Sequence, residues 1–246
     1  MDTGKTQKLM RSAWEVALEL LWPTRCAVCD LPGERVLCKQ CEDALETIDA
    51  CKACPRCGAP YGHAQCTECN DVMLRAAGID HFPIDAMAHA LVLDDAARRI
   101  VSVYKDSDER RLSSFIAERM ARLVSPQEVR EGYVITYIPD SREAFRRRGF
   151  DHGRELALSL SNLCGLECLD AFERPKSVDQ RKLGRQDRIQ NMQGRLCVRA
   201  DCRVPKRVIV ADDVCTTGAT IYAACAALRD AGATSIHAIT FAQVMD

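Results

Sequence analysis

Residues 208–220 read VIVADDVCTTGAT, and this stretch decides the fold. An apolar run predicts a buried strand that ends in two adjacent carboxylates, and a turn rich in hydroxyl groups then opens a helix. The first turn of a helix offers unpaired N–H groups to an anion, and a glycine lets the backbone approach a phosphate closely. Carboxylates repel phosphate but accept hydrogen bonds from sugar hydroxyls. The stretch therefore predicts a site for a ribose 5-phosphate unit, whose candidate residues are Asp212, Asp213, Thr216, Thr217, Gly218, Ala219 and Thr220.

The chain around this stretch alternates predicted strands with predicted helices from about residue 84 onward. The predicted strands are short and apolar and lie at 84–93, 133–138, 166–171, 207–211 and 235–244. The predicted helices space their apolar residues by three and four and lie at 95–104, 109–124, 151–164 and 219–231. This alternation is typical of an α/β domain with a mostly parallel sheet flanked by helices on both faces. We expect residues 84–246 to form that domain.

The cysteines form a repeated pattern near the start of the chain. Fifteen cysteines are an unusually high number for 246 residues, and nine of them lie within residues 26–69. Eight of the nine form two units of the pattern Cys-x2-Cys-x8-Cys-x2-Cys, offset by 28 residues. Zinc prefers tetrahedral thiolate sites, and a Cys-x2-Cys turn brings two sulfur atoms to one ion. We expect a double zinc ribbon over residues 24–75, with two structural Zn2+ ions held by Cys26, Cys29, Cys38, Cys41, Cys54, Cys57, Cys66 and Cys69.

The spacing leaves open how the two ions share these ligands. In a sequential arrangement each unit holds one ion, and in an interleaved arrangement each ion takes ligands from both units. Metal ligation is favoured over disulfide bonds because the polar start of the chain carries no secretory signal, and a cytoplasmic chain keeps its thiols reduced. We therefore expect a cytoplasmic protein.

Residues 1–23 predict an amphipathic helix, with an apolar stripe that ends before Pro23. The helix is expected to pack on the rest of the protein, and docking to a membrane surface or a partner is the alternative. The apolar stretch 9–22 is too short for a transmembrane span, which needs ~20 apolar residues, and it contains charged side chains. A location peripheral to the inner face of the membrane therefore remains compatible with the sequence.

Charge is distributed unevenly along the chain. The net charge is -1 and 47% of the residues are hydrophobic, which excludes a disordered chain and a polycation as a whole. Residues 1–95 nevertheless carry 9 Lys/Arg against 15 Asp/Glu, and residues 142–207 carry 16 against 9. The basic part has few aromatic residues. It fits solvated faces around a pyrophosphate pocket, and equally a surface that follows the backbone of single-stranded DNA.

The stretch 208–220 resembles the 5-phosphoribosyl-1-pyrophosphate (PRPP) motif of type I phosphoribosyltransferases. Together with the two Cys units, it makes the chain similar to the ComF (competence protein F) family from about residue 22 to residue 244. The resemblance implies a type I phosphoribosyltransferase-like sheet with a small N-terminal double zinc-ribbon domain. Further matches are the element Arg148-Gly149-Phe150 and the spaced set Arg174, Gln180, Leu183, Arg188, Asn191 and Gly194.

The resemblance also implies roles for single residues. Asp212 and Asp213 would contact the ribose hydroxyls, and residues 216–220 would hold the 5-phosphate. The residues of the pyrophosphate loop would be Pro139, Asp140, Ser141 and Arg142. The basic residues of the lid and its surroundings would include Arg148, Arg174, Gln180 and Arg188.

Two positions depart from the family pattern. Residues 139–141 read Pro-Asp-Ser where family members commonly read Pro-Val-Pro, and Asp151-His152 stands where Asn-Gln is usual. Asp140 would repel a pyrophosphate. His152 lies near the Arg-Gly-Phe element, and that position alone makes it a weak candidate for the site.

Two functions follow from the resemblance. The first is a binding protein for a PRPP-type ligand with a role in DNA uptake during natural transformation. Its partners would then be single-stranded DNA and DNA-processing proteins such as a competence helicase. The second is an active phosphoribosyltransferase, a pentosyl-transferring enzyme that uses Mg2+ and moves ribose 5-phosphate from PRPP to a base or amine. Asp140 and the lack of an evident base pocket favour the first.

Overall fold

The computed structural model describes residues 23–76, 79, 81–107, 109–175, 194 and 196–245. The predicted N-terminal helix up to residue 22, and the lid candidates Gln180 and Arg188, lie outside these residues. Contacts divide the chain into two units, Met1–Leu45 and Glu46–Asp246. The division falls between the two Cys units. The predicted boundaries at 24–75 and 84–246, which follow the sequence repeat, stay a prediction.

The described part of the first unit is a zinc-ribbon loop followed by the short helix α2 (Lys39–Asp43). The backbone N–H of Cys26 donates to the carbonyl of Leu31 at 2.9 Å, and the N–H of Ala27 donates to that of Val36 at 2.8 Å. These bonds form the turn that carries the first two cysteines. Large apolar side chains are few in this segment, so metal binding is expected to supply much of its stability.

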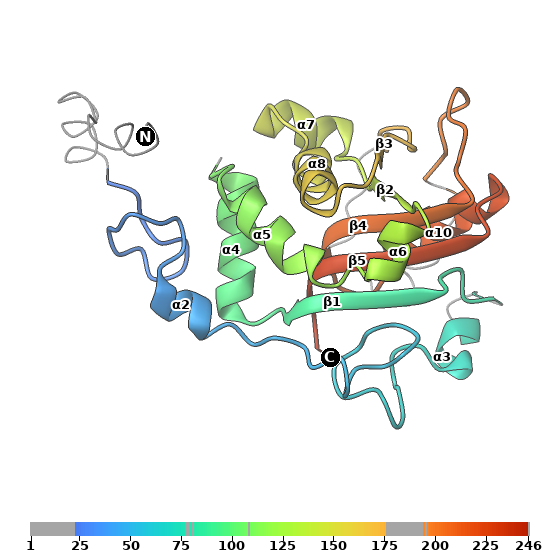
Figure 1. Cartoon of the computed structure of the whole chain (residues 1–246), viewed down its shortest axis with the longest axis horizontal. Helices are drawn as coiled ribbons and strands as arrows, with labels where there is room; N and C mark the ends of the chain where they lie inside the picture. Colours follow the sequence, from blue (N-terminus) through green and yellow to red (C-terminus); the bar gives the residue numbers. More distant parts are fainter. Residues whose placement is uncertain are drawn as a thin grey trace, which may run out of the picture. The chain divides into compact units, whose positions relative to one another are not determined.

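The second unit contains a five-stranded sheet in the order β1-β5-β4-β2-β3, with every pair parallel (Figure 1). This confirms the predicted sheet. The strands are β1 (Ala86–Val92), β2 (Val134–Tyr137), β3 (Cys168–Leu169), β4 (Arg207–Cys215) and β5 (Ser235–Gln243).

Strand β4 is longer than the sequence predicted. The prediction ended at Ala211, but the ladder to β5 continues through Asp212 opposite Thr240 and Val214 opposite Ala242. The two carboxylates therefore lie on a paired strand and not in the turn that follows it. Local sequence could not reveal this, because adjacent acids are unfavourable in a strand unless distant partners compensate them.

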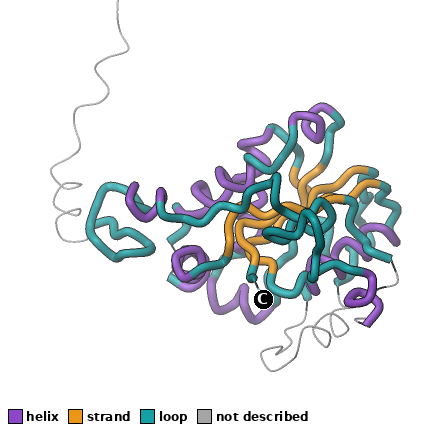
Figure 2. The backbone as a smooth tube through the Cα atoms, turned by 90° about the horizontal axis from the view of Figure 1, so that it is seen from below, coloured by secondary structure: helices purple, strands orange, loops and turns teal. Residues whose placement is uncertain are grey.

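Helices cover both faces of the sheet, and Figure 2 shows the strands surrounded by helices and loops. The pair α5 (Leu112–Ala121) and α8 (His152–Cys164) packs on one face, and α10 (Ala219–Asp230) packs on β4 and β5. The remaining helices are α3 (Asp71–Ala76), α4 (Asp95–Asp106), α6 (Pro126–Arg130) and α7 (Arg142–Arg148). Four helices, α4, α6, α7 and α8, begin with an N-cap side chain that accepts a hydrogen bond from the backbone N–H three residues further on. These N-cap residues are Asp94, Ser125, Ser141 and Asp151.

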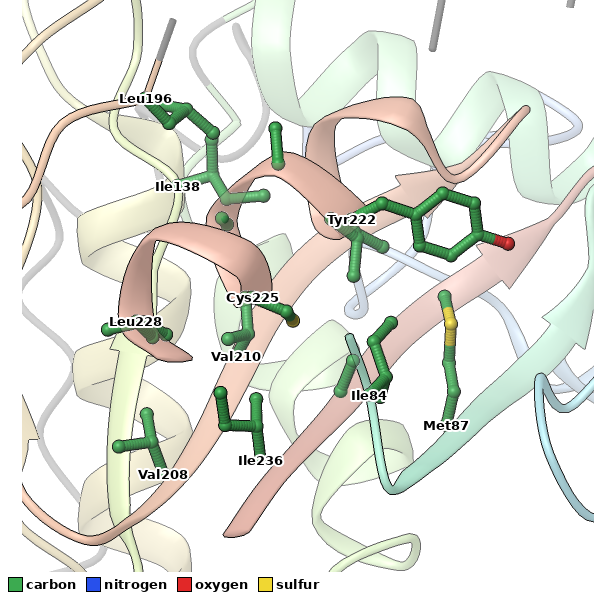
Figure 3. Close-up of a cluster of buried hydrophobic side chains, with 14 of the residues drawn as sticks. Ile84, Met87, Ile138, Leu196, Val208, Val210, Tyr222, Cys225, Leu228 and Ile236 are labelled. Carbon is green, nitrogen blue, oxygen red and sulfur yellow. The ribbon is translucent and has the colours of Figure 1, made fainter. Parts of the chain in front are cut away.

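The core beneath α10 follows the alternation of the strands. Val208 and Val210 pack against Leu228 and Cys225 of α10 and Ile236 of β5 (Figure 3). The intervening residue of β4 points to the opposite face, where the ring of Phe115 in α5 meets that of Phe241 edge-on, with 6.2 Å between ring centroids. Both faces of β4 are therefore buried, which fixes the register of this strand and the position of the turn after it.

Candidate functional site

The eight zinc-ligand candidates form two clusters, each made by one Cys unit. Within a cluster the four sulfur atoms all lie within 4.8 Å of one another, which suits a single tetrahedral ion. The arrangement is therefore sequential and not interleaved. The clusters are Cys26, Cys29, Cys38 and Cys41, and Cys54, Cys57, Cys66 and Cys69.

A buried histidine ties the second cluster to the sheet of its own unit. His89 of β1 donates from Nε2 to the carbonyl oxygen of Cys57 at 2.9 Å, and its Nδ1 lies 2.6 Å from the hydroxyl oxygen of Thr240. Burial lowers the pKa of His89 to about 4, so the ring is neutral near pH 7. Gly58 has a φ of +72°, and a Cβ there would lie 2.7 Å from the carbonyl oxygen of Met87. The second ribbon thus packs closely against β1.

A cavity of about 620 Å³ lies at the carboxyl ends of β2 and β4. Its walls come from the turn after β2, from α4, from the start of α8 and from the β4–α10 stretch. The residues that line it include Arg98, Ser102, Lys105, Asp106, Pro139, Asp140, Ser141, Arg148, His152, Asp212, Asp213, Thr216 and Thr220. The fold thus brings most of the predicted ribose–phosphate residues and three of the predicted pyrophosphate-loop residues to one cavity.

The turn before α10 has the geometry expected of an anion-binding turn. Gly218 is the N-cap of α10 with a φ of +75°, and a Cβ there would lie 2.5 Å from the ring of Tyr222. Only glycine fits this position. Gly218 has no side chain to cap the helix, and a helix start of this kind offers first-turn N–H groups to an anion. Thr216 and Thr220 line the cavity, whereas Thr217 is buried and its hydroxyl accepts from the N–H of Ala219 at 3.4 Å.

The adjacent carboxylates differ in their partners. Asp213 is 4% exposed and forms an ion pair with Lys105 of α4. Burial alone would raise the pKa of Asp213, but Lys105 and His152 outweigh it and hold this pKa at about 2. Burial and the charge of Asp213 raise the pKa of Asp212 to about 8. At neutral pH the pair therefore carries close to one negative charge, located on Asp213.

Asp140 does not project freely into the cavity. It is 7% exposed, accepts from a terminal nitrogen of Arg148 at 2.8 Å and lies 2.7 Å from Nδ1 of His152. Burial would raise the pKa of Asp140, but His152 and Arg148 lower it below its usual value. His152 Nε2 is also 3.6 Å from the carboxylate of Asp213. The two positions that depart from the family pattern are therefore partners in one hydrogen-bonded cluster.

The other candidate residues of the pyrophosphate turn have different surroundings. Ser141 caps α7 by accepting from the N–H of Ala144 at 3.2 Å. Arg142 lines a second cavity of about 530 Å³ and not the first. Arg174 lies 2.7 Å from the carboxylate of Asp151 and stacks on the ring of Phe145, with its guanidinium carbon 4.2 Å from the ring centroid. The structure therefore places Arg174 as a link between α7 and the N-cap of α8.

Sequence reasoning missed the contribution of α4. Arg98, Ser102 and Lys105 line the cavity from one face of this helix. Their spacing of four and three residues was a readable signal of a common face. Nothing in the local sequence indicated that this face would meet the acids of β4, because the contact joins segments about a hundred residues apart.

Comparison with known proteins supports the same architecture. The model of the double zinc ribbon domain matches residues 17–73. The competence protein ComFC of Streptococcus pneumoniae (strain R6) is 25% identical over 204 residues, which cover 81% of this chain and 84% of that protein. The protein of the same name from Bacillus subtilis (strain 168) is 25% identical over 219 residues, with coverages of 85% and 84%.

Solved structures with a similar arrangement include an orotate phosphoribosyltransferase from Aeropyrum pernix (20% identity, TM-score 0.34), with 59% of this chain and 64% of that chain covered. A hypoxanthine phosphoribosyltransferase from Trypanosoma cruzi is similar at 12% identity and a TM-score of 0.35, with coverages of 57% and 79%. The match thus spans less than two thirds of the orotate enzyme.

The fold defines a double zinc-ribbon protein with a parallel α/β sheet and a cavity at the strand ends. The predicted fold class is confirmed, and the chain is ComF-like. In the part of the chain that the structure describes, no helix is long and apolar enough to cross a membrane.

Loss of the second zinc cluster is expected to destabilise the second unit, whereas loss of the first cluster is not. Cys57→Ser should reduce the zinc content from two ions to one and lower the melting temperature of the second unit by at least ~5 °C, because that cluster is bonded to β1 through His89. Cys29→Ser should also remove one ion but leave that transition near its wild-type temperature, because its cluster belongs to the first unit. Metal analysis and thermal unfolding test this, with the exposed Cys51→Ser as control. Equal melting shifts for Cys57→Ser and Cys29→Ser would contradict it.

Asp212 is expected to reduce stability at alkaline pH. Its pKa is higher in the folded state than in the unfolded state. Between about pH 4 and pH 8 the folded state therefore keeps a proton on Asp212 that the unfolded state has lost, so the free energy of unfolding falls as the pH rises through this range. Asp212→Asn should therefore raise the free energy of unfolding relative to wild type, with a difference that grows from pH 5 to pH 8 by less than ~1.4 kcal/mol per pH unit. Urea unfolding at several pH values measures this. A difference that is constant with pH would show that Asp212 has an ordinary pKa.

Proposed function

We propose that this chain acts in DNA uptake as a ComF-like protein that binds a phosphoribosyl ligand of the PRPP type in the cavity at the ends of β2 and β4. The proposal rests on the observation that two groups of residues, each suited to one part of a ribose 5-phosphate unit, line the same cavity. One is the N-terminal turn of α10, which is suited to a phosphate, and the other is the Asp212–Asp213 pair, which is suited to ribose hydroxyls. The names of the two ComFC relatives support the role in competence.

The ligand would lie across the end of β4. Its 5-phosphate would accept hydrogen bonds from the first-turn N–H groups of α10 and from the hydroxyls of Thr216 and Thr220. Its ribose hydroxyls would donate to Asp213, which stays ionised because Lys105 compensates its charge. Mg2+ would enter coordinated by the phosphate oxygens of a pyrophosphate-bearing ligand and would offset part of its charge.

Binding explains the cavity better than transferase activity does. A transferase that uses PRPP must stabilise a departing pyrophosphate with cations directed at it. Two cations that line the cavity are already engaged with carboxylates, Arg148 with Asp140 and Lys105 with Asp213. Transfer of ribose 5-phosphate from PRPP to a base or amine is therefore the second candidate, and no contact among the described residues of the cavity favours it over binding.

The surface of α7 supports contact with single-stranded DNA. Arg142, Arg146 and Arg147 are exposed on this helix, and Phe145 between them is 38% exposed, with Arg174 stacked on its ring. Exposed Lys and Arg side chains neutralise successive phosphates, and an aromatic ring offers a platform for a base. We infer that this surface handles DNA in a cytoplasmic complex with DNA-processing proteins such as a helicase.

Ligand binding is tested by calorimetry with ribose 5-phosphate and with Mg2+–PRPP. At least one of them should bind at micromolar concentration, and Thr216→Val/Thr220→Val should weaken it roughly tenfold or more through loss of two hydrogen bonds to a charged group. 2-Deoxyribose 5-phosphate should bind more weakly than ribose 5-phosphate, because one hydroxyl is lost to the carboxylates. Thr234→Val is the control, since Thr234 bonds to Lys206 away from the cavity. Absence of heat with a folded, zinc-loaded sample would refute the proposal.

DNA contact is tested with a single-stranded oligonucleotide over a range of salt concentrations. Arg146→Ala/Arg147→Ala should weaken binding and reduce the slope of log K against log salt by about 1.4, at about 0.7 per lost phosphate contact. Arg122→Ala/Arg130→Ala removes two exposed arginines at the ends of α5 and α6 and should change neither quantity. If both double variants behaved alike, the surface of α7 would have no specific part in DNA binding.

A further inference from the structure

Charge pairing inside the cavity limits which phosphoribosyl compound it can take. We propose that the site selects a ribose 5-phosphate monoester and discriminates against a second phosphate group elsewhere on the ligand, so that PRPP is not its preferred ligand. This inference rests on the proposed function, because it assumes that the ligand's 5-phosphate occupies the turn before α10.

The first step concerns where an anion can be placed. The N-terminal turn of α10 is a site for one phosphate group, formed by backbone N–H groups and two hydroxyls. A ribose that extends from this site over Asp213 directs its remaining substituents toward the turn after β2 and toward α4. A second phosphate would therefore have to lie beside Asp140, Lys105 or Arg148.

The second step is that the cations there already have carboxylate partners. Lys105 pairs with Asp213, and Arg148 pairs with Asp140 at 2.8 Å and lies 3.6 Å from Asp106. Among the described residues of this part of the cavity, the two cations are thus matched one to one by the buried carboxylates of Asp213 and Asp140, and Asp106 adds an exposed acid. A dianionic group placed here would have to displace an existing ion pair, which leaves a buried carboxylate without compensation.

The third step is that Asp140 cannot easily turn away from the cavity wall. Its carboxylate is buried and is held by Arg148, by Nδ1 of His152 at 2.7 Å and by the backbone N–H of His152 at 3.3 Å. His152 is held in turn, because the hydroxyl of Tyr104 donates to its carbonyl oxygen at 2.8 Å. The negative charge of Asp140 is therefore a fixed feature of this wall.

Arg98 does not change this balance. It lines the cavity on the first half of α4, but its side chain is exposed, so its charge is screened by solvent. An exposed cation contributes far less to binding a phosphate than a buried one. Among the residues that the structure describes around the cavity, the turn before α10 is therefore the best site for an anion.

The inference is tested by comparing two ligands on two variants. Wild type should bind ribose 5-phosphate about tenfold or more tighter than PRPP at saturating Mg2+, because like charges meet only with PRPP. Asp140→Asn keeps the shape of the side chain and frees Arg148, so it should raise the affinity for PRPP at least about fivefold and change that for ribose 5-phosphate by less than about twofold. Asp201→Asn, which removes an exposed acid paired with Arg199 outside this cavity, is the matched control.

The outcomes separate the two proposals. Preferential binding of ribose 5-phosphate, together with a gain in PRPP affinity in Asp140→Asn alone, supports the inference. Tighter binding of PRPP than of ribose 5-phosphate by wild type overturns the inference and leaves the phosphoribosyl site in place. An unchanged ratio of the two affinities in Asp140→Asn overturns the part assigned to Asp140. If neither ligand binds to folded protein, the proposed function fails and the inference fails with it.

Discussion

The parallel pairing of β4 with β2 on one side and with β5 on the other is the constraint on which the site depends. Val134 pairs with Val208, and Asp212 pairs with Thr240, so the three strands end at the same edge of the sheet. In a parallel sheet all carboxyl ends meet there. The turn after β2 and the turn before α10 therefore share one cavity, although more than seventy residues separate them in the chain.

The burial of two acids at the end of β4 has an energetic cost that other elements offset. Lys105 compensates Asp213 from α4, while Asp212 becomes easier to protonate. Arg148 and His152 compensate Asp140 from the segment between α7 and α8. The cluster thus connects α4, the end of β4 and the segment between α7 and α8 through charge. A change in one member therefore acts first on its direct ion-pair partner.

Patterns that depend on neighbouring residues could be predicted from the sequence. The apolar run of β4, the helix start at Ala219 and the eight zinc ligands all follow from spacing, and Gly218 follows from the turn that it must form. Contacts between distant segments could not be predicted. The sequential sharing of the zinc ligands, the approach of Lys105 to Asp213 and the bond from His89 to the second ribbon all depend on how the chain packs.

The pairing of Asp140 with His152 shows why the departures from the family pattern should be considered together. Without the His152 side chain, Asp140 would keep Arg148 and one backbone N–H as partners, and without Asp140 the Nδ1 of His152 would lose its contact at 2.7 Å. Present together, they bond to each other and hold the carboxylate of Asp140 in place on the cavity wall. This pair belongs to the part of the cavity that the family resemblance assigns to pyrophosphate, whereas the turn before α10 keeps the residues that the resemblance assigns to the 5-phosphate.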